Sequence, residues 1–313
     1  MKKPVITTYK IREASRKEPG WWVGAPSATY VEGYGFLLGY RLRGGDGRRG
    51  YENRLAFSQD GISFEDIVVF EGKALSTRSM ERPCIRKIGD EFICYLSYVD
   101  SETDRWKIDF VTSDSPEKLD IKNLRPALNG SDCNAEAVKD PYVVVGDGNV
   151  NMYVSYAQKV ANINEIESDI RDSGDVFTIQ SVLSRTGLAT STDGKQFTWS
   201  GSVLNPRPNL LDSHTARLSG IIPFSPKDLV FYDANTDEGS NYEEEATLAI
   251  MDSDTEIRPL GRLESWISQL SADRIRYVDP ILVNNNLYVY YERTTSSGAH
   301  DLCVSVMRWG EQS

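Results

Sequence analysis

The sequence predicts an all-β fold, a five-bladed β-propeller with four antiparallel strands in each blade. Three observations predict it: a strand-turn-strand unit recurs along the chain, its anchoring prolines are regularly spaced, and helical periodicity is scarce. Each unit has a strand opened by X-Pro, a turn of Gly, Asp or Asn, an aromatic-rich strand, a polar loop and a third strand. A β-sandwich or a propeller with another blade number is the alternative.

Length and composition limit the classes of function. The chain has 313 residues and is 40% hydrophobic, so it can bury a large core, and we expect one domain over residues 1–313. The net charge of −11 argues against a nucleic acid partner, because phosphate binding requires a cationic face. No apolar run is long enough to span a membrane, and the N-terminus has no apolar signal-peptide core. We therefore expect a soluble, cytoplasmic protein without a membrane or nucleic acid partner.

The first two units begin at Ala25-Pro26 and Arg82-Pro83. In the first, GAPSATYV and YGFLLGYRLR flank a turn at Glu32-Gly33, and NRLAFSQDGISF follows. In the second, ERPCIRKI and EFICYLSYVD flank Gly89-Asp90. Glycine in such a turn supplies the positive φ that a tight hairpin requires. Both stretches therefore predict hairpins followed by further strands.

The third and fifth units begin at Asp140-Pro141 and Asp279-Pro280. The third, DPYVVVGDGNVNMYVSY, is the most regular hairpin of the chain, and VDPILVNNNLYVYYERT repeats its pattern. The segments FSQDGISF and TSTDGKQF share an Asp-Gly turn, so a fourth strand is expected after each third strand. Four antiparallel strands are the size of one propeller blade.

The spacing of the prolines leaves room for one more unit. The steps between prolines 26, 83, 141 and 280 are 57, 58 and 139 residues, and the last step is about two units long. ARLSGIIPFSPKDLVFYDANTDEGSNYEEEATLAIMDSD fits there as the fourth unit. Counting back from its second strand places Arg217 where the other units have Ala25, Arg82, Asp140 and Asp279.

Outside the repeats, the sequence predicts little regular structure. Only SDIRDSGDV and GRLESWISQL are suited to a turn or two of helix. The stretch Gln158 to Thr186 is longer than an ordinary blade loop, so we expect a lid or a contact with another subunit, which makes an oligomer a further expectation. The cysteines lack metal-ligand spacing, and we expect them to be free and buried.

The residues that open the inner strands are the candidate site, because inner strands of a propeller converge at one mouth of its channel. Around the ring they are Ala25, Glu81 with Arg82, Asp140, Arg217 and Asp279. Acids and arginines together suit an uncharged or anionic polyol. The alternative is that Asp-Pro only begins a strand, where proline is tolerated because no ladder donor is needed.

The segments VKDPYVVV, YVDPILVN, MYVSYA, YVYYER and ATSTDGKQFTW resemble the five-bladed propeller glycosidases. These are family 43, its family 32 invertase and levansucrase relatives, and the family 130 mannoside phosphorylases. The resemblance implies a general base at an Asp before proline in the first blade, a middle-blade Asp that tunes pKa, and a Glu as general acid. Asp140 fits the middle-blade residue. The first-blade position is Ala25, so the base of that pattern is missing.

Three explanations for Ala25 remain open. Glycoside hydrolysis needs two carboxyl groups, and other blades could supply them, with Glu81 or Glu136 acting beside Asp140 or Asp279. Phosphorolysis needs one protein acid, because bound phosphate is the nucleophile. A propeller that binds glycans without catalysis needs neither. We expect a glycoside hydrolase acting on a small oligosaccharide or glycoside, with the phosphorylase and the glycan-binding protein as alternatives.

The remaining candidates surround this pair. Cations beside the acids would hold one carboxylate ionised, and residues after the second-strand tyrosines of the fourth and fifth units could donate the missing proton. With no His pair at i, i+4 and no Cys near a His, we expect no metal and no cofactor. Glu244 is expected on a solvated loop. The substrate-binding candidates are Arg82, Arg217, His214, Asp233, Glu292 and Trp22.

Overall fold

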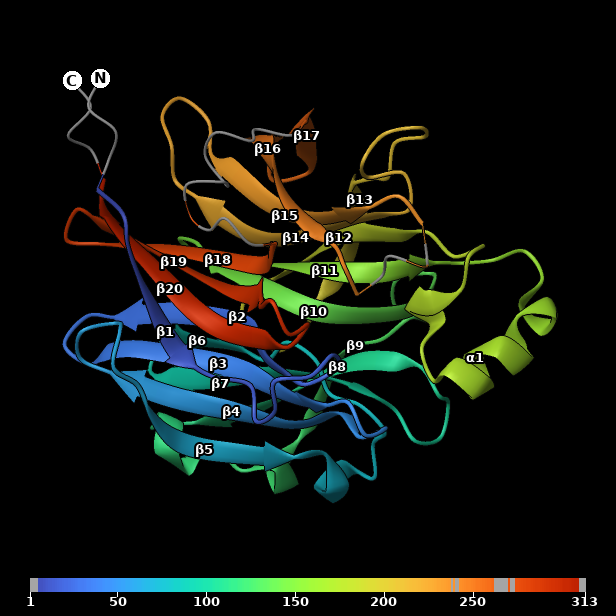
Figure 1. The fold of residues 1–313 in the computed structure, drawn as a ribbon, viewed down its shortest axis with the longest axis horizontal. Coiled ribbons are helices and arrows are strands. Elements are labelled where there is room, and N and C mark those ends of the chain that lie inside the picture. The colour runs from blue at the N-terminus through green and yellow to red at the C-terminus, as the bar shows by residue number, and fades with distance from the viewer. Residues whose placement is uncertain (1–4, 238, 240–241, 262–269, 271–273, 310–313) are drawn as a thin grey trace.

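The computed structural model describes residues 5–237, 239, 242–261, 270 and 274–309. They form strands β1 to β20, the short helix α1 and the 3-10 turns η1 to η5, which confirms an all-β fold. Figure 1 shows strands throughout the molecule, with α1 standing at one edge. Of the two expected helical stretches, SDIRDSGDV overlaps α1 (Glu167–Ser173) in all but the first residue of the helix, and GRLESWISQL lies almost wholly outside the described residues.

The strands pair in antiparallel units of four, which follow the predicted repeats. The first unit is β2 (Trp22–Val31), β3 (Gly35–Gly44), β4 (Arg49–Ser58) and β5 (Glu65–Glu71). The second is β6 (Cys84–Ile88), β7 (Glu91–Val99), β8 (Trp106–Ser113) and β9 (Arg125–Leu128). The third is β10 (Ala135–Val145), β11 (Val150–Gln158), β12 (Ser184–Ser191) and β13 (Thr198–Leu204). The fourth is β14 (Thr215–Ile222), β15 (Leu229–Asn235), β16 (Glu245–Ser253) and β17 (Glu256–Gly261).

The fifth unit is completed by the N-terminal strand. It contains β18 (Ile275–Val283), β19 (Asn286–Thr294), β20 (His300–Arg308) and β1 (Thr7–Arg12), and β1 pairs antiparallel with β20. Figure 1 shows β1 in dark blue beside β20 in red. The sequence repeats did not indicate this strand. Its signal is TTYKIR, a short run of strand formers ahead of the first repeat, together with the missing fourth strand of the last repeat.

Single parallel bridges join neighbouring units. Trp22 pairs with His300 between the first and fifth units, and Ser184 pairs with Thr215 between the third and fourth. These bridges merge four units into two eight-stranded sheets, while β6 to β9 form a separate four-stranded sheet.

A tyrosine of the second strand contacts the next unit at three places. Tyr290, Tyr95 and Tyr153 have equivalent positions in β19, β7 and β11. Each hydroxyl donates to a backbone oxygen in the turn after the third strand of the neighbour: Gly61 at 2.8 Å, Gly194 at 2.7 Å and Asp254 at 3.2 Å. The repeated contact orders the units as fifth to first, second to third and third to fourth.

The turns that accept these bonds are built by the Ser-x-Asp-Gly sequences of the first and third units. Ser58 Oγ accepts from Gly61 N at 2.9 Å, and Ser191 Oγ accepts from Gly194 N at 2.9 Å. Gly61 and Gly194 have φ of 73° and 70°, which is why glycine follows the aspartate. The predicted Asp-Gly turns are therefore confirmed.

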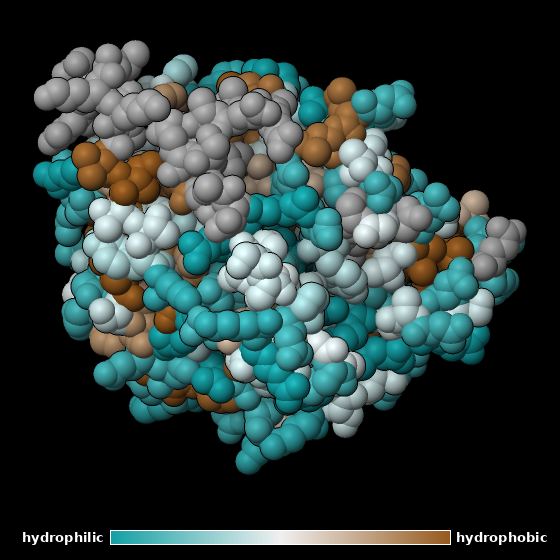
Figure 2. All heavy atoms as spheres, in the orientation of Figure 1, coloured by the Kyte–Doolittle hydropathy of each residue, from teal (hydrophilic) through white to brown (hydrophobic). Residues whose placement is uncertain are grey.

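The core lies between the units and under the insertion. The cysteines are free and buried, as expected, and Cys84 pairs with Tyr95 rather than facing Cys94 across the hairpin. The insertion contains η4 (Ile163–Glu165), α1 and η5 (Val176–Thr178), and it packs against the second and third units. The remaining 3-10 turns are η1 (Gly72–Leu75), η2 (Pro116–Lys118) and η3 (Ile121–Asn123). On the face shown in Figure 2, hydrophilic residues dominate and hydrophobic ones form small separate groups.

Candidate active site

A bulge interrupts the first strand of each unit, and it fixes which residues correspond. In β2, β10 and β18 two residues stand opposite one, after the pairs Gly24 with Arg41, Lys139 with Ser155 and Arg276 with Glu292. The first bulge residue has positive φ in all three: 49° at Ala25, 53° at Asp140 and 53° at Tyr277. Non-glycine residues rarely adopt this conformation, and such strain concentrates at functional sites.

This register corrects two of the predicted correspondences. Ala25 and Asp140 do hold equivalent places. Tyr277, not Asp279, holds that place in the fifth unit, because its bulge begins two residues before Asp279. Arg217 pairs with Asp233 and lies one residue earlier than predicted. The residues just ahead of this place are therefore Gly24, Glu81, Lys139, Arg217 and Arg276.

These positions carry a buried belt of charges with alternating sign. Arg41 lies between Glu81 and Glu292, with 2.9 Å from Nε to Glu81 Oε2 and 2.9 Å from Nη2 to Glu292 Oε2. Arg276 continues the belt, 2.8 Å from Glu292 Oε1 and 2.6 Å from Glu244 Oε2. Arg41 and Arg276 are thus each paired with two carboxylates.

The belt ends in the fourth unit at Arg217, whose Nη1 lies 2.9 Å from Glu244 Oε1. The expectation that Glu244 lies on a solvated loop is wrong, because the residue is 3% exposed and bridges two arginines. Buried charges persist when they are paired in this way.

Glycine is required at position 24 by the same belt. A Cβ on Gly24 would lie 2.1 Å from Glu292 Oε2, so the carboxylate of the fifth unit occupies the space that a side chain fills in the other units. Glu292 Oε2 also accepts a hydrogen bond from Ala25 N at 3.1 Å. The first unit therefore contributes backbone, not a side chain, at this point of the ring.

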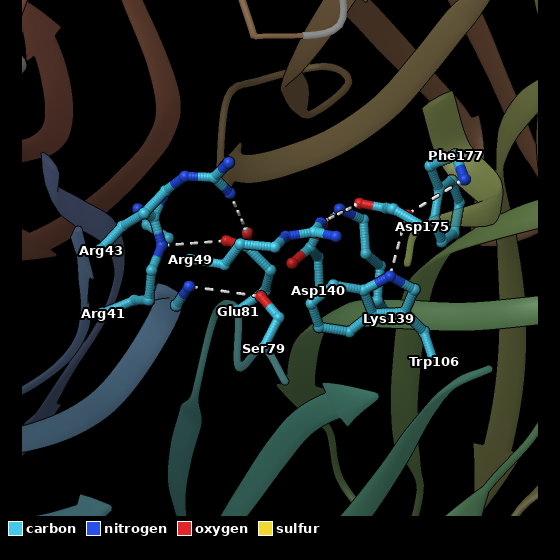
Figure 3. A network of polar contacts seen from close by, with 12 residues as sticks. Arg41, Arg43, Arg49, Ser79, Glu81, Trp106, Lys139, Asp140, Asp175 and Phe177 are labelled. Atoms are coloured by element: carbon cyan, nitrogen blue, oxygen red, sulfur yellow. Dashed lines mark hydrogen bonds and ion pairs between the residues drawn. The ribbon is translucent and has the colours of Figure 1, made fainter. Parts of the chain in front are cut away.

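Asp140 lies in the gap between the two ends of the belt. Its carboxyl is 2% exposed, and neither oxygen accepts a hydrogen bond from any residue that the structure describes. Lys139 Nζ is 3.6 Å from Oδ2. Burial, and next the charge of Glu81, raise the pKa of Asp140 against the opposing effects of Lys139 and Arg217. Figure 3 shows Asp140 beside Glu81, in the middle of the network.

Glu81 has the opposite environment. Burial opposes its ionisation, but Arg41, Lys139 and Arg43 together hold its pKa below the usual value. Neighbouring carboxyl groups whose pKa values are moved in opposite directions are suited to act as an acid and a base at the same pH. Glu81 and Asp140 therefore form the pair on which acid-base chemistry can be built.

Asp233 of the fourth unit binds the backbone of Tyr277 in the fifth unit, and both residues are buried near this pair. Both oxygens of Asp233 accept from Tyr277 N, at 3.1 and 2.9 Å, and so fix the strained backbone there. Burial raises the pKa of Asp233 to about 7. Burial, then the charges of Asp140 and Glu81, raise the pKa of the Tyr277 phenol well above its usual value, so it stays protonated.

Asp279 and Arg82 form a separate buried pair. Asp279 Oδ2 is 3.1 Å from Arg82 Nη2 and accepts from Ala28 N at 2.7 Å. Arg82 donates from Nε to Pro26 O at 2.8 Å and lowers the pKa of Asp140. Asp279 thus joins the first unit to the second and reaches the acid pair only through Arg82.

The insertion supplies one wall of the site. Asp175 accepts from Trp106 Nε1 at 2.9 Å and pairs with Arg49 Nη2 at 2.7 Å (Figure 3). Although burial opposes it, Arg49 and then Lys139 hold the pKa of Asp175 at about 2. The Phe177 ring lies 4.8 Å from Lys139 Nζ. The insertion therefore packs on its own chain and holds Lys139 beside Asp140, while the expected subunit contact stays a prediction.

Several predicted residues have other roles. Glu136 accepts from Val160 N at 3.1 Å, which ties it to the insertion rather than to Asp140. Glu292 is less suited than Asp233 to donate a proton, because Arg276 and Arg41 hold its pKa well below the usual value despite burial. Burial lowers the pKa of His300, which is therefore neutral and donates from Nδ1 to Glu292 Oε1 at 2.6 Å.

Two further candidates lie at the edge of the belt. His214 is buried directly before β14, with Nδ1 3.2 Å from Thr215 Oγ1. Trp22 is 7% exposed, and His300 stacks on its ring at 4.6 Å, so no open face for stacking a sugar is evident.

The sequence interpretation missed Arg41, Arg43, Lys139, Arg276 and Tyr277. On the first strands it considered the residues next to each proline, and so passed over Lys139, Arg276 and Tyr277. On the second strands it considered only the residues after the tyrosines of the fourth and fifth units, and so passed over Arg41 and Arg43. The signal for Arg41 and Arg43 is their alternation in YRLRG, which puts both side chains on one face of β3.

A cavity lies at the opposite ends of the same first strands. Its volume is about 470 Å³, and Ala28 to Val31, Arg86 and Tyr142 to Val145 are among its lining residues. Arg86 already donates to carbonyl oxygens, from Nε to Val143 at 2.7 Å and from Nη1 to Ile85 at 2.7 Å. Two aspartates, Asp228 and Asp254, also line it, and they accept hydrogen bonds from Phe224 N at 3.1 Å and from Asn151 Nδ2 at 3.0 Å. Neither oxygen of Asp140 accepts such a bond within the described residues, so the chemistry is assigned to the ends where Glu81 and Asp140 lie.

Within the described residues, no cluster of three His, Cys, Asp or Glu side chains is suited to a metal ion. The same residues contain no helix long and apolar enough to cross a membrane.

Comparison with known proteins shows similarity of fold. No family model and no curated protein matches the sequence. A thermostable family-43 glycoside hydrolase aligns with a TM-score of 0.64 and 13% identity, over 93% of this chain and 90% of the other. A family 43 enzyme from Xanthomonas citri, complexed with xylose, gives 0.63 and 12%, over 97% and 95%. The β-1,2-mannobiose phosphorylase from Listeria innocua gives 0.56 and 14%, over 98% and 92%.

Proposed function

We propose that this chain is a five-bladed β-propeller enzyme, a single domain, that hydrolyses glycosidic bonds in a small oligosaccharide or glycoside. Five antiparallel units, the contacts between them and the fold of family 43 glycoside hydrolases support the propeller. The observation that carries the function is the pair of neighbouring buried carboxyl groups, Asp140 and Glu81, whose pKa values are moved in opposite directions.

The roles follow from these environments. Asp140, whose pKa is raised, gives its proton to the glycosidic oxygen as the bond to the anomeric carbon breaks. Glu81, held ionised by Arg41, either attacks the anomeric carbon or takes a proton from the attacking water. The separation of the two carboxyl groups around bound sugar decides between these routes. In both, water is consumed and each fragment leaves with one hydroxyl.

This assignment also accounts for Ala25. The carboxylate absent there is replaced by Glu81, which the second unit contributes one position earlier in the register. The unpartnered oxygens of Asp140 further support a role toward a ligand, because a buried carboxyl without donors is costly unless a bound group completes it.

The test compares two leaving groups. Asp140→Asn should lower kcat/KM on methyl glycosides by about 10²–10⁴-fold, the usual contribution of a general acid, and less on 4-nitrophenyl glycosides, whose leaving group needs no proton. Glu81→Gln should lower both rates alike. Asp147→Asn, in the exposed turn of the same hairpin, is the matched control and should change neither. If the wild type turns over no glycoside in a broad panel, hydrolysis is excluded.

Phosphorolysis is the second candidate, favoured by Ala25, because phosphate would take the place of the second protein carboxylate. Turnover that requires inorganic phosphate and releases a sugar phosphate would select it over hydrolysis. Binding of a glycan without turnover, unchanged in Asp140→Asn, would instead select a glycan-binding protein.

A further inference from the structure

Two aromatic rings contact the side chain of Arg43 at the edge of the site. Its guanidinium carbon lies 4.5 Å from the centroid of the Trp22 ring and 4.7 Å from that of Tyr242. The two rings are themselves 5.4 Å apart and tilted by 56°, so they contact the guanidinium together without enclosing it. Cation–π contacts of this kind position an arginine and leave the N–H groups that are directed away from the rings for other partners.

Those donors are unused. The side chain of Arg43 makes no hydrogen bond to any described residue, and its Nε and Nη1 are buried. The nearest carboxylate oxygen, Glu81 Oε1, is 3.7 Å away, while Arg41 lies 2.9 Å from the other oxygen of Glu81. Buried donors without acceptors are costly, so a missing partner is indicated.

A second donor lies at the same place. Trp22 Nε1 is buried and has no acceptor among the described residues. The indole and guanidinium groups can only donate hydrogen bonds, so the partner must be rich in acceptors.

Arg43 is also more exposed than the arginines of the belt. Its side chain is 10% exposed, compared with 0% for Arg41 and 6% for Arg217 and for Arg276. Tyr242 beside it is 37% exposed. A group that enters with the substrate would therefore meet Arg43 before it reaches the acid pair.

We propose that the substrate carries an anionic group, a carboxylate or a phosphate ester, and that the Arg43 guanidinium and the Trp22 indole N–H bind it. A planar guanidinium with free edges matches two oxygens of such a group at once. This inference rests on the proposed function, since it places the anionic group on the sugar that Asp140 and Glu81 cleave.

The experiment measures binding and turnover separately. Calorimetry on the full-length Asp140→Asn variant compares D-glucuronate, D-galacturonate and glucose 6-phosphate with glucose and galactose, and inorganic phosphate is titrated alone. At least one anionic sugar should bind about tenfold tighter or more than its neutral counterpart. Arg43→Gln should abolish that preference, and Arg43→Lys should retain part of it.

The matched control is Arg48→Gln. Arg48 also lies over aromatic rings, those of Trp21 and Tyr51 at 5.2 and 4.8 Å, but its side chain is 51% exposed and paired with Asp46. The preference for the anionic sugar should remain in this variant. Thermal unfolding of each variant checks that a loss of binding is not a loss of fold.

Three results would overturn the inference: equal binding of neutral and anionic sugars, a preference that survives Arg43→Gln, or binding of inorganic phosphate alone, which makes the anion a co-substrate. Turnover of glycosides by the wild type is measured in parallel. Arg43-dependent binding without turnover would support the anion site and reject hydrolysis. Turnover of neutral glycosides without a preference for anionic sugars would support hydrolysis and reject the anion site.

Discussion

At the scale of single residues, the candidate site depends on a difference between neighbouring carboxyl groups. Asp140 is buried with no hydrogen-bond donor to its oxygens among the described residues, whereas Glu81 is buried beside Arg41. Removal from water favours the neutral form of a carboxyl, and a paired cation favours the ionised form. Two buried carboxyl groups therefore have pKa values that are moved in opposite directions.

Lys139 provides a test of this difference through the pH dependence of activity. Its charge lowers the pKa of both Asp140 and Glu81. Activity needs Glu81 ionised, which sets the acidic limb of the profile, and Asp140 protonated, which sets the alkaline limb. Lys139→Met removes the cation and raises both pKa values, so both limbs of kcat/KM should move to higher pH by about one unit.

The control is Lys118→Met, whose side chain is 67% exposed and pairs with Asp114. Its profile should match that of the wild type. Movement of the two limbs in opposite directions in Lys139→Met would contradict the assignment of the acid and the base.

Residue-level prediction succeeded where a proline marks the bulge and failed where it does not. Ala25 and Asp140 both precede proline and do correspond. In the fifth unit the bulge falls at Tyr277, two residues ahead of Asp279, and only the hydrogen-bond register reveals the displacement.

At the scale of elements, the contact between a second-strand tyrosine and a neighbouring turn is the repeated connection between units. Tyr95 also packs edge-on against Phe197, with centroids 6.0 Å apart, as Tyr290 does against Phe64 at 6.0 Å. The turn conformation and the aromatic ring therefore depend on each other across the unit boundary.

Removing one such hydroxyl should destabilise the fold without changing its shape. Tyr95→Phe leaves the Gly194 carbonyl without its buried donor, which should lower the free energy of unfolding by about 1–3 kcal/mol. Denaturant unfolding measures the loss. Tyr9→Phe, at a tyrosine that is 39% exposed, should lower it by much less, and equal losses would show that the contact contributes nothing.

The sequence was informative about elements wherever local chemistry determines them. The Asp-Gly turns and the Asn284-Asn285 turn, with φ of 49° and 61°, follow from residue type. Pairings between distant segments do not follow from residue type. Glu244, directly before β16, was therefore expected on a solvated loop, although it pairs with Arg217 of β14 and Arg276 of β18.

At the scale of the whole molecule, the belt of charges unites units that are distant in sequence. Arg41, Arg276 and Arg217 belong to the first, fifth and fourth units, and the carboxylates between them alternate around the ring. Neither local propensity nor repeat spacing could reveal such a belt, because it exists only when the units close on each other. The all-β class and the antiparallel hairpins were, in contrast, accessible from the repeats.

The strand β1 is the element that the repeats could not supply, and it has a consequence for the connectivity of the chain. Because Thr7 pairs with Val306, β20 and β1 are adjacent and antiparallel, and a short linker would turn them into an ordinary hairpin. A circular permutant joined there and reopened between the exposed residues Pro208 and Asn209 would have every unit continuous in sequence.

Such a permutant should fold and keep its activity, but it should melt at a lower temperature than the native chain. The new ends would separate the third and fourth units, which are joined by a single parallel bridge, and no strand from one end would interlock with the other. An unchanged melting temperature would mean that sharing the fifth unit between the two ends of the chain adds nothing to its stability. A folded permutant would show that the native order of the units is one of several that encode this fold. The native order is the one in which the two ends of the chain share the fifth unit.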